Sequence, residues 1–149
     1  MEKNPKHLFD LDIRLTWHKL SRMYNQKAAS YGISMAVGFI LLQIDRDGTP
    51  STQLGPRMGM EPTSLSRTLK TMEERGFIRR KEDPSDKRVV RIFLTDEGLK
   101  ARYIARDVVF AFNNHVSAQV SDQELAVFMR VIGKLQHIID GESDSSVTN

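Results

Sequence analysis

The sequence contains no cysteine, and this absence removes several classes of function at once. Without thiols there is no disulfide, no thiolate metal site, no cysteine nucleophile and no thiol redox sensor. The four histidines, His7, His18, His115 and His137, are scattered and never take a metal-binding helical spacing. No serine lies in a nucleophile elbow and no glycine-rich phosphate loop is present. The sequence therefore predicts no enzyme: no catalytic residue, no metal and no cofactor.

Long hydrophobic runs are absent as well. The longest one, over residues 35–44, is interrupted by Gln43 and is far too short to span a bilayer. The first residues lead into no apolar segment of the kind found in signal peptides. We therefore expect a cytoplasmic protein without a membrane partner, a location that also fits the lack of cysteine.

Charge is nearly balanced overall but unevenly distributed. The 149 residues carry a formal net charge of +3. Residues 51–95 hold ten lysines and arginines against six acidic residues, so the excess positive charge lies in the middle of the chain. A basic segment within a near-neutral chain indicates a polyanionic partner.

The middle segment contains a helix with well-marked ends, predicted over residues 61–76. Pro62 suits the first helical position, and Gly76 suits the left-handed position after the last turn. Its apolar residues form one narrow stripe: Leu65, Leu69 and Met72.

The opposite face of this helix carries small and basic residues. At 100° per residue, Thr63, Arg67, Lys70 and Glu74 point away from the apolar stripe. Such a face lets a helix backbone approach a DNA major groove, where Arg67 could read guanine. Hydroxyls at its N-terminal end could reach bases or phosphates: Thr63, Ser64 and Ser66. An ordinary surface helix is the alternative interpretation.

The residues before this helix predict three more helices. Asn4 and the following proline resemble a helix start, and a wide apolar face then runs to a stop before Gly32. Ser34 is predicted to cap a second, nearly all-apolar helix over residues 35–46, and residues 47–50 read as a turn. Ser51 or Thr52 is predicted to open a third helix around residues 54–58. We expect this helix to be brief, because Pro56 lies inside it and proline is tolerated only in the first turn of a helix.

The residues after Gly76 change from helical to alternating periodicity. Short strands are predicted over 77–81 and 89–94, joined by the polar loop 82–88. Thr95 caps a helix that runs to about residue 119. Ser121 and Glu124 form a capping box for a last helix ending near residue 140, and residues 141–149 are expected to be a disordered tail.

Three stretches of the chain together resemble the MarR (multiple antibiotic resistance regulator) family of winged helix-turn-helix transcription regulators. They are the start of the marked helix (61–69), its end with the first strand (73–80), and the hairpin tip leading into the next helix (83–88 and 94–98). The resemblance covers about residues 8–139. The chain departs from the family at Gly55-Pro56, where such proteins more often carry a helix-forming pair.

This resemblance implies a mainly α fold with a small β-hairpin wing. It implies an N-terminal dimerisation helix (1–33), a winged helix-turn-helix DNA-binding lobe (34–95) and C-terminal dimerisation helices (96–140). The protein would act as a homodimer, as a regulator and most simply a repressor, on an inverted repeat in double-stranded DNA. In the family the wing arginine, here Arg88, enters the minor groove, and Asp86 would orient it.

Phosphate contacts are predicted from position and charge. Ser51 and Thr52 sit at a helix N-terminus, where amides and hydroxyls bind phosphate. Four basic side chains are further candidates, each of which could instead be merely solvated: Lys70, Arg79, Lys81 and Lys87.

An effector site is the last prediction. Regulators of this kind often bind small anionic aromatic or lipophilic molecules, and Arg14, His18 and Arg22 lie at i, i+4 and i+8 on the first helix. The alternative is a solvated basic stripe beside a dimer seam. Two other functions stay open: a winged-helix protein–protein adaptor without DNA binding, and a metal-sensing regulator using histidine and carboxylate ligands.

Overall fold

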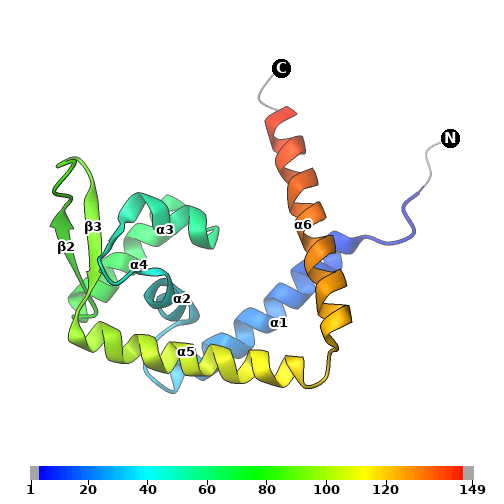
Figure 1. Cartoon of the computed structure of the whole chain (residues 1–149), viewed down its shortest axis with the longest axis horizontal. Coiled ribbons are helices and arrows are strands. Elements are labelled where there is room, and N and C mark those ends of the chain that lie inside the picture. The colour runs from blue at the N-terminus through cyan, green and yellow to red at the C-terminus, as the bar shows by residue number, and fades with distance from the viewer. Residues whose placement is uncertain (1–3, 146–149) are drawn as a thin grey trace. The chain divides into compact units, whose positions relative to one another are not determined.

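The computed structural model describes residues 4–145 (Figure 1). The chain forms two compact units, Met1–Val108 and Val109–Asn149, which divide within helix α5. The first unit contains the sheet and most of the helices, and the second contains the end of α5 together with α6. The finer division into three functional segments stays a prediction.

Helix α1 spans Phe9–Ala29 and begins later than predicted. The expected start at Asn4 is wrong, because Asn4 lies in irregular backbone well before the first helical residue. Asp10 and Asp12 occupy the first turn, where carboxylates stabilise a helix N-terminus. These acidic residues mark the start better than an Asn-Pro pair does.

Only the last turns of α1 are buried in the first unit, through Tyr24 and Ala28. The apolar face predicted for its earlier turns is present but exposed to solvent. Its exposed large residues are Leu8, Phe9, Leu11, Ile13, Leu15 and Trp17.

Helix α2 spans Met35–Gln43 and supplies the centre of the core. The Ser34 hydroxyl accepts a hydrogen bond from the Val37 amide at 3.2 Å, so the predicted cap is confirmed. The helix ends before residue 46 because Ile44 adopts extended backbone and the Asp45 amide donates to the Thr49 hydroxyl at 2.8 Å.

A strand missing from the sequence-based prediction follows. Strand β1 (Thr49–Pro50) pairs antiparallel with β3 (Val90–Leu94), with Thr49 opposite Ile92. Residues 47–50 are thus not a simple turn: the turn ends at Gly48 and the strand begins directly after it. Two residues, one of them proline, are too few to show alternation.

Helices α3 and α4 form the helix-turn-helix. Helix α3 (Ser51–Met58) begins and ends as predicted, but Pro56 lies inside it rather than in its first turn. Pro56 cannot donate a hydrogen bond to the Thr52 carbonyl, and the helix ends at Met58, directly before the left-handed Gly59. Helix α4 (Pro62–Glu74) begins at proline, and Gly76 has φ +75°, as predicted.

The wing is formed by β2 (Ile78–Glu82) and β3, and the sheet order is β1-β3-β2. Ile78 lies opposite Leu94, and Arg80 lies opposite Ile92. Ile78 and Ile92 bury one side of this sheet against α2 and α4. The fully buried core side chains include Ile40, Leu41, Ile44, Leu54, Met72 and Ile92.

Helix α5 (Asp96–Ser117) starts in tight contact with the wing. The Thr95 hydroxyl accepts from the Gly98 amide at 3.0 Å, which confirms the cap, and the Thr95 amide donates to the Phe77 carbonyl. A Cβ on Gly98 would lie only 2.9 Å from the Phe77 carbonyl carbon. Glycine is therefore required for the helix to approach the strand this closely.

In the second unit, α6 spans Asp122–Ser145. The capping box is confirmed: the Glu124 carboxylate accepts from the Ser121 amide at 2.9 Å, and the Ser121 hydroxyl accepts from the Glu124 amide at 3.2 Å. The helix continues through Gly141, so the disordered tail expected from residue 141 is wrong up to Ser145. Residues 146–149 of that tail lie outside the described residues.

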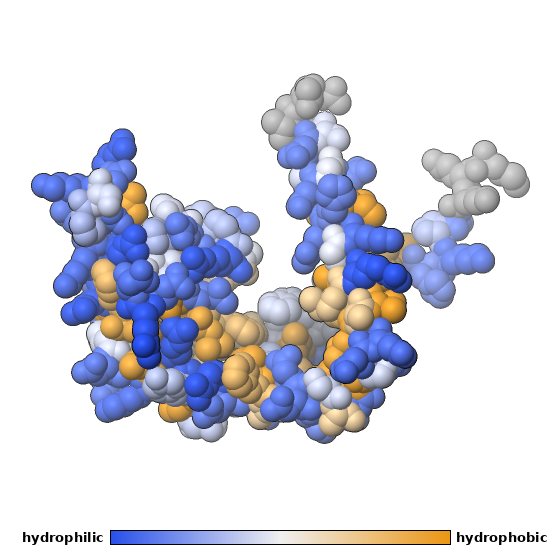
Figure 2. Space-filling view, in the orientation of Figure 1, coloured by the Kyte–Doolittle hydropathy of each residue, from blue (hydrophilic) through white to orange (hydrophobic). Residues whose placement is uncertain are grey.

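Across residues 4–145, no helix is both long and apolar enough to cross a membrane. Apolar side chains nevertheless reach the surface of α6, as Figure 2 shows. The exposed ones are Val127, Phe128, Met129, Val131, Ile138 and Ile139.

Candidate nucleic-acid interface

Helix α4 presents the face that its periodicity predicted. Leu65, Leu69 and Met72 are buried, which turns the opposite face to solvent. All of the predicted contact residues on this helix are exposed: Thr63, Ser64, Ser66, Arg67 and Lys70. Two other hydroxyls of α4 bond to the helix itself, since Thr68 donates to the Ser64 carbonyl and Thr71 to the Arg67 carbonyl.

The N-termini of α3 and α4 open onto one groove. Ser51, Thr52 and Ser66 all line it, so the structure brings these three predicted residues together. No side chain caps either helix, whereas Ser34, Thr95 and Ser121 accept backbone hydrogen bonds at the starts of α2, α5 and α6. The first amides of α3, and those that follow Pro62 in α4, thus remain available to an anion.

Arg88 at the tip of the wing is 90% exposed yet held in one orientation. Its Nε and Nη2 atoms donate to the two Asp86 carboxylate oxygens at 3.1 and 3.2 Å, and its amide donates to Oδ1 at 3.0 Å. These bonds lower the pKa of Asp86, the side-chain bond from Arg88 having the largest effect. Lys87 lies beside this pair and is exposed. The contact between Asp86 and Arg88 is therefore present as predicted.

A second acid–base pair, missed in the sequence, anchors the base of the wing. Asp83 is 7% exposed and accepts from Arg91 Nη2 at 2.9 Å. The Nη1 atom of Arg91 also donates to the Gly48 carbonyl at 2.9 Å, which links the wing to the turn before β1. In the sequence, only the Asp83-Pro84 pair pointed to a structural role for Asp83. Its carboxylate accepts a hydrogen bond from the Ser85 amide at 2.8 Å, which forms an Asx-turn. The partner eight residues away has no signal in the sequence.

We expect Asp83→Asn to lower the thermal stability of the protein by several degrees at neutral pH. Hydrogen bonds from the Ser85 amide and then from Arg91 hold the pKa of Asp83 below its usual range. Because this pKa is lower in the folded than in the unfolded state, the stabilisation is present above the unfolded value, about 4, and is lost as the pH falls through the folded value. Melting curves between neutral and acidic pH should show the variant losing less stability on acidification.

The matched control is Asp47→Asn, which changes an exposed carboxylate in the neighbouring turn. Equal destabilisation by both substitutions, or an unchanged acid dependence in Asp83→Asn, would contradict the role of the Asp83–Arg91 pair.

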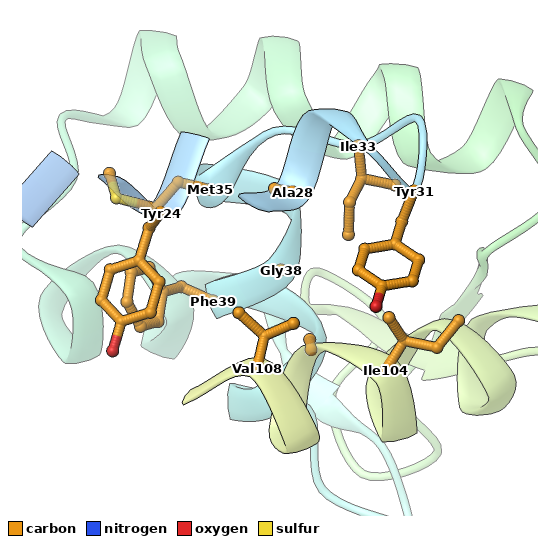
Figure 3. Close-up of a pocket in the computed structure, with 10 residues that line it drawn as sticks. Tyr24, Ala28, Tyr31, Ile33, Met35, Gly38, Phe39, Ile104 and Val108 are labelled. Carbon is orange, nitrogen blue, oxygen red and sulfur yellow. The ribbon is translucent and has the colours of Figure 1, made fainter. Parts of the chain in front are cut away.

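Arg14, His18 and Arg22 lie on exposed turns of α1. None of them lines the apolar cavity of about 30 Å³ that lies between α1, α2 and α5 in the first unit. In this cavity the rings of Tyr24 and Phe39 meet edge to face, and the ring of Tyr31 lies on the other side (Figure 3). The remaining lining is apolar, including Ile33, Met35, Ile104 and Val108.

Metal-ligating side chains do not cluster in the part of the chain that the structure describes. Within residues 4–145 there is no group of three or more histidines and carboxylates suited to a metal ion. A metal-sensing regulator has no ligand set among these residues.

Residues 33–90 match the family model described as the MarR family. The structure of the transcriptional regulator SlyA aligns with a TM-score of 0.80 at 19% identity, covering 91% of this chain and 96% of that one. The S. aureus MepR–DNA complex aligns with a TM-score of 0.79 at 19% identity, covering 89% and 98%. A mutant MarR from E. coli complexed with operator DNA gives 0.73 at 21% identity, covering 83% and 89%. The predicted fold class, mainly helical with a small antiparallel sheet in a winged-helix arrangement, is confirmed.

Proposed function

We propose that this protein, whose residues 33–90 match the MarR family model, is a transcription regulator of that family. It binds double-stranded DNA sequence-specifically and represses transcription. It acts as a homodimer on an inverted repeat. The observation that best supports this proposal is the presence of two exposed arginines on separate elements that could contact DNA: Arg67 on α4 and Arg88 on the wing. Two solved structures of the same fold, those of MepR and the mutant MarR, hold DNA.

The exposed face of α4 suits a major groove. Its small hydroxyl residues let the backbone come close, and Arg67 can offer two parallel donors to guanine O6 and N7. The uncapped amides of α3 and α4, with the hydroxyls of Ser51 and Thr52, would then donate to phosphates at the groove edge.

Arg88 suits a minor groove. A narrow groove concentrates negative potential, and a guanidinium on a thin hairpin can reach into it. The two bonds to Asp86 fix the direction of the Arg88 side chain before DNA arrives, so less side-chain entropy is lost on binding.

Dimerisation is supported by apolar surface in each unit. On α6, Leu125, Phe128, Ile132, Leu135 and Ile139 repeat at intervals of three and four, the spacing of a helix–helix seam. Phe128 is 57% exposed and Met129 63% exposed, and the early turns of α1 expose a further apolar row. Apolar patches of this extent mark protein–protein contacts.

The proposed function also includes release of the protein from DNA by a small amphipathic acid. It rests on the apolar cavity of Figure 3, which adjoins α1. At about 30 Å³ this cavity holds about a water molecule, so an aromatic acid would have to displace Tyr31 or α1 to enter. Arg14, His18 and Arg22 stay the proposed partners of its carboxylate, but they do not line the cavity, so the acid would have to extend from it onto the exposed turns of α1.

The test is a titration of the purified protein against the DNA upstream of its own gene, followed by footprinting. We expect a protected inverted repeat whose half-sites lie about one helical turn apart, or a multiple of it. Light scattering should give a dimer before DNA is added. An asymmetric footprint with one bound protomer, or a monomer in solution, would contradict the homodimer, and the absence of any DNA binding would favour the adaptor alternative.

A further inference from the structure

The wing sheet has two sides of opposite character. Ile78, Leu94 and Ile92 pack with the core, and the exposed Arg80, opposite Ile92, lies on the same side of the sheet. The alternate pairs, Arg79 with Phe93 and Lys81 with Arg91, therefore lie on the other side. We call these four residues the wing flank: Arg79, Lys81, Arg91 and Phe93.

Two cations of the wing flank carry charge that no acidic side chain balances. The Arg79 guanidinium lies 5.6 Å from the centre of the Phe93 ring, and Lys81 Nζ lies 5.9 Å from it. Within residues 4–145 neither side chain is within ion-pair distance of a carboxylate. By contrast, Arg80 pairs with Glu73 at 2.8 Å and Arg91 pairs with Asp83.

The ring of Phe93 orders both cations. Gly48 packs against this ring, since a Cβ at that position would lie 2.6 Å from it. The Arg79 guanidinium and the Lys81 ammonium both lie over the aromatic ring, and both side chains remain exposed to solvent. Along an extended strand the two residues are roughly 7 Å apart, similar to the spacing of successive phosphates on one DNA strand.

The direction in which the wing flank faces identifies its occupant. The core side of the sheet packs with α4, so the wing flank faces away from the recognition helix. A duplex that contacts both α4 and the tip of the wing would extend beyond the wing, on the side where the wing flank lies. The wing flank and the residues Lys87 and Arg88 belong to the same hairpin. The nearest polyanion would therefore be the same duplex beyond the inverted repeat.

We propose that the wing flank binds the phosphate backbone of DNA outside the operator repeat, through Arg79 and Lys81. This inference rests on the proposed DNA binding and adds a prediction that the latter does not make. The affinity depends on the length of duplex beyond the repeat, whatever its sequence, because phosphate contacts carry no base information.

The experiment compares two duplexes that carry the inverted repeat protected in footprinting. One ends at the edges of the repeat, and the other extends by about one helical turn on each side. The proteins are the unchanged chain, the Arg79→Gln/Lys81→Gln variant and a charge-matched control, Lys19→Gln/Lys27→Gln, which removes two exposed charges from α1. Glutamine keeps part of the aliphatic chain and removes the charge, and melting curves establish that each variant folds.

The unchanged protein and the control should bind the longer duplex about tenfold more tightly at moderate salt. The Arg79→Gln/Lys81→Gln variant should bind both duplexes equally, and its salt slope on the longer one should fall by about two units for each engaged wing. If the double variant fails to fold, the Arg79→Gln and Lys81→Gln single variants test the inference instead, together with the dependence of the unchanged protein's affinity on duplex length.

Two results would overturn the wing-flank inference while leaving DNA binding intact. The unchanged protein could bind both duplexes equally, which would leave the wing flank to an acidic protein or to solvent. The variant could instead weaken both duplexes by the same factor, which would place Arg79 and Lys81 within the repeat. A protein that protects no repeat refutes the proposed function itself, and the inference with it.

Discussion

The Gly98→Ala variant should unfold well below the melting temperature of the unchanged protein. Its new Cβ would overlap the backbone of Phe77, which cannot move freely because the Phe77 carbonyl already accepts from the Thr95 amide. Overpacking typically costs about 1–3 kcal/mol, and the upper end of that range corresponds to a loss of roughly 10 °C for a unit of this size. Thermal melts followed by circular dichroism measure the effect.

The matched control is Gly38→Ala, also in a helix of the first unit. A Cβ on Gly38 would lie 3.7 Å from that of Ala105, an ordinary van der Waals distance, so this variant should be neutral or stabilised by about 0.5–1 kcal/mol. Equal melting temperatures for the two variants would show that α5 can shift away from Phe77 at little cost.

Loss of Arg67 should have the largest effect on DNA recognition. The exposed Arg67 can make a bidentate contact with guanine, so Arg67→Ala should cost about 1–3 kcal/mol for each half-site and relax the preference at one base pair. Lys70→Ala removes a charge one turn further on and should weaken all sequences alike, reducing the salt slope by about one unit. The measurement is a binding series on one operator, its half-site mutants and random DNA.

Arg88→Ala completes this series, because Arg88 would read groove width rather than base edges. Its removal should weaken operators with A/T-rich flanks most. If Arg67→Ala and Lys70→Ala behaved identically on every DNA, the assignment of base reading to Arg67 would be wrong.

Elements with strong local periodicity were predictable from the sequence. In α4 the apolar spacing of Leu65, Leu69 and Met72 determined which side is exposed, and Pro62 and Gly76 marked both ends. The capping box at Ser121 was equally local, since both partners lie within one turn. Such signals need no knowledge of the rest of the fold.

Features that depend on distant partners could not be predicted. Strand β1 exists because Thr49 finds Ile92 across the sheet, and its two residues carry no pattern of their own. The anchoring of the wing needs Arg91 to reach both Asp83 and the Gly48 carbonyl, 43 positions away along the chain. The same limit applies to Gly98, whose importance comes from the nearby Phe77 backbone rather than from its own helix.

The two outer edges of the small sheet bear on how the protein behaves at high concentration. Unpaired edge strands invite other chains to add a strand, which is a route to aggregation. One edge here, β1, is only two residues long and includes Pro50, which has no amide hydrogen to donate. The other edge, β2, carries Arg79, Arg80 and Lys81, so two such edges repel each other. The hairpin can therefore project into solvent without templating intermolecular β-structure in a crowded cell.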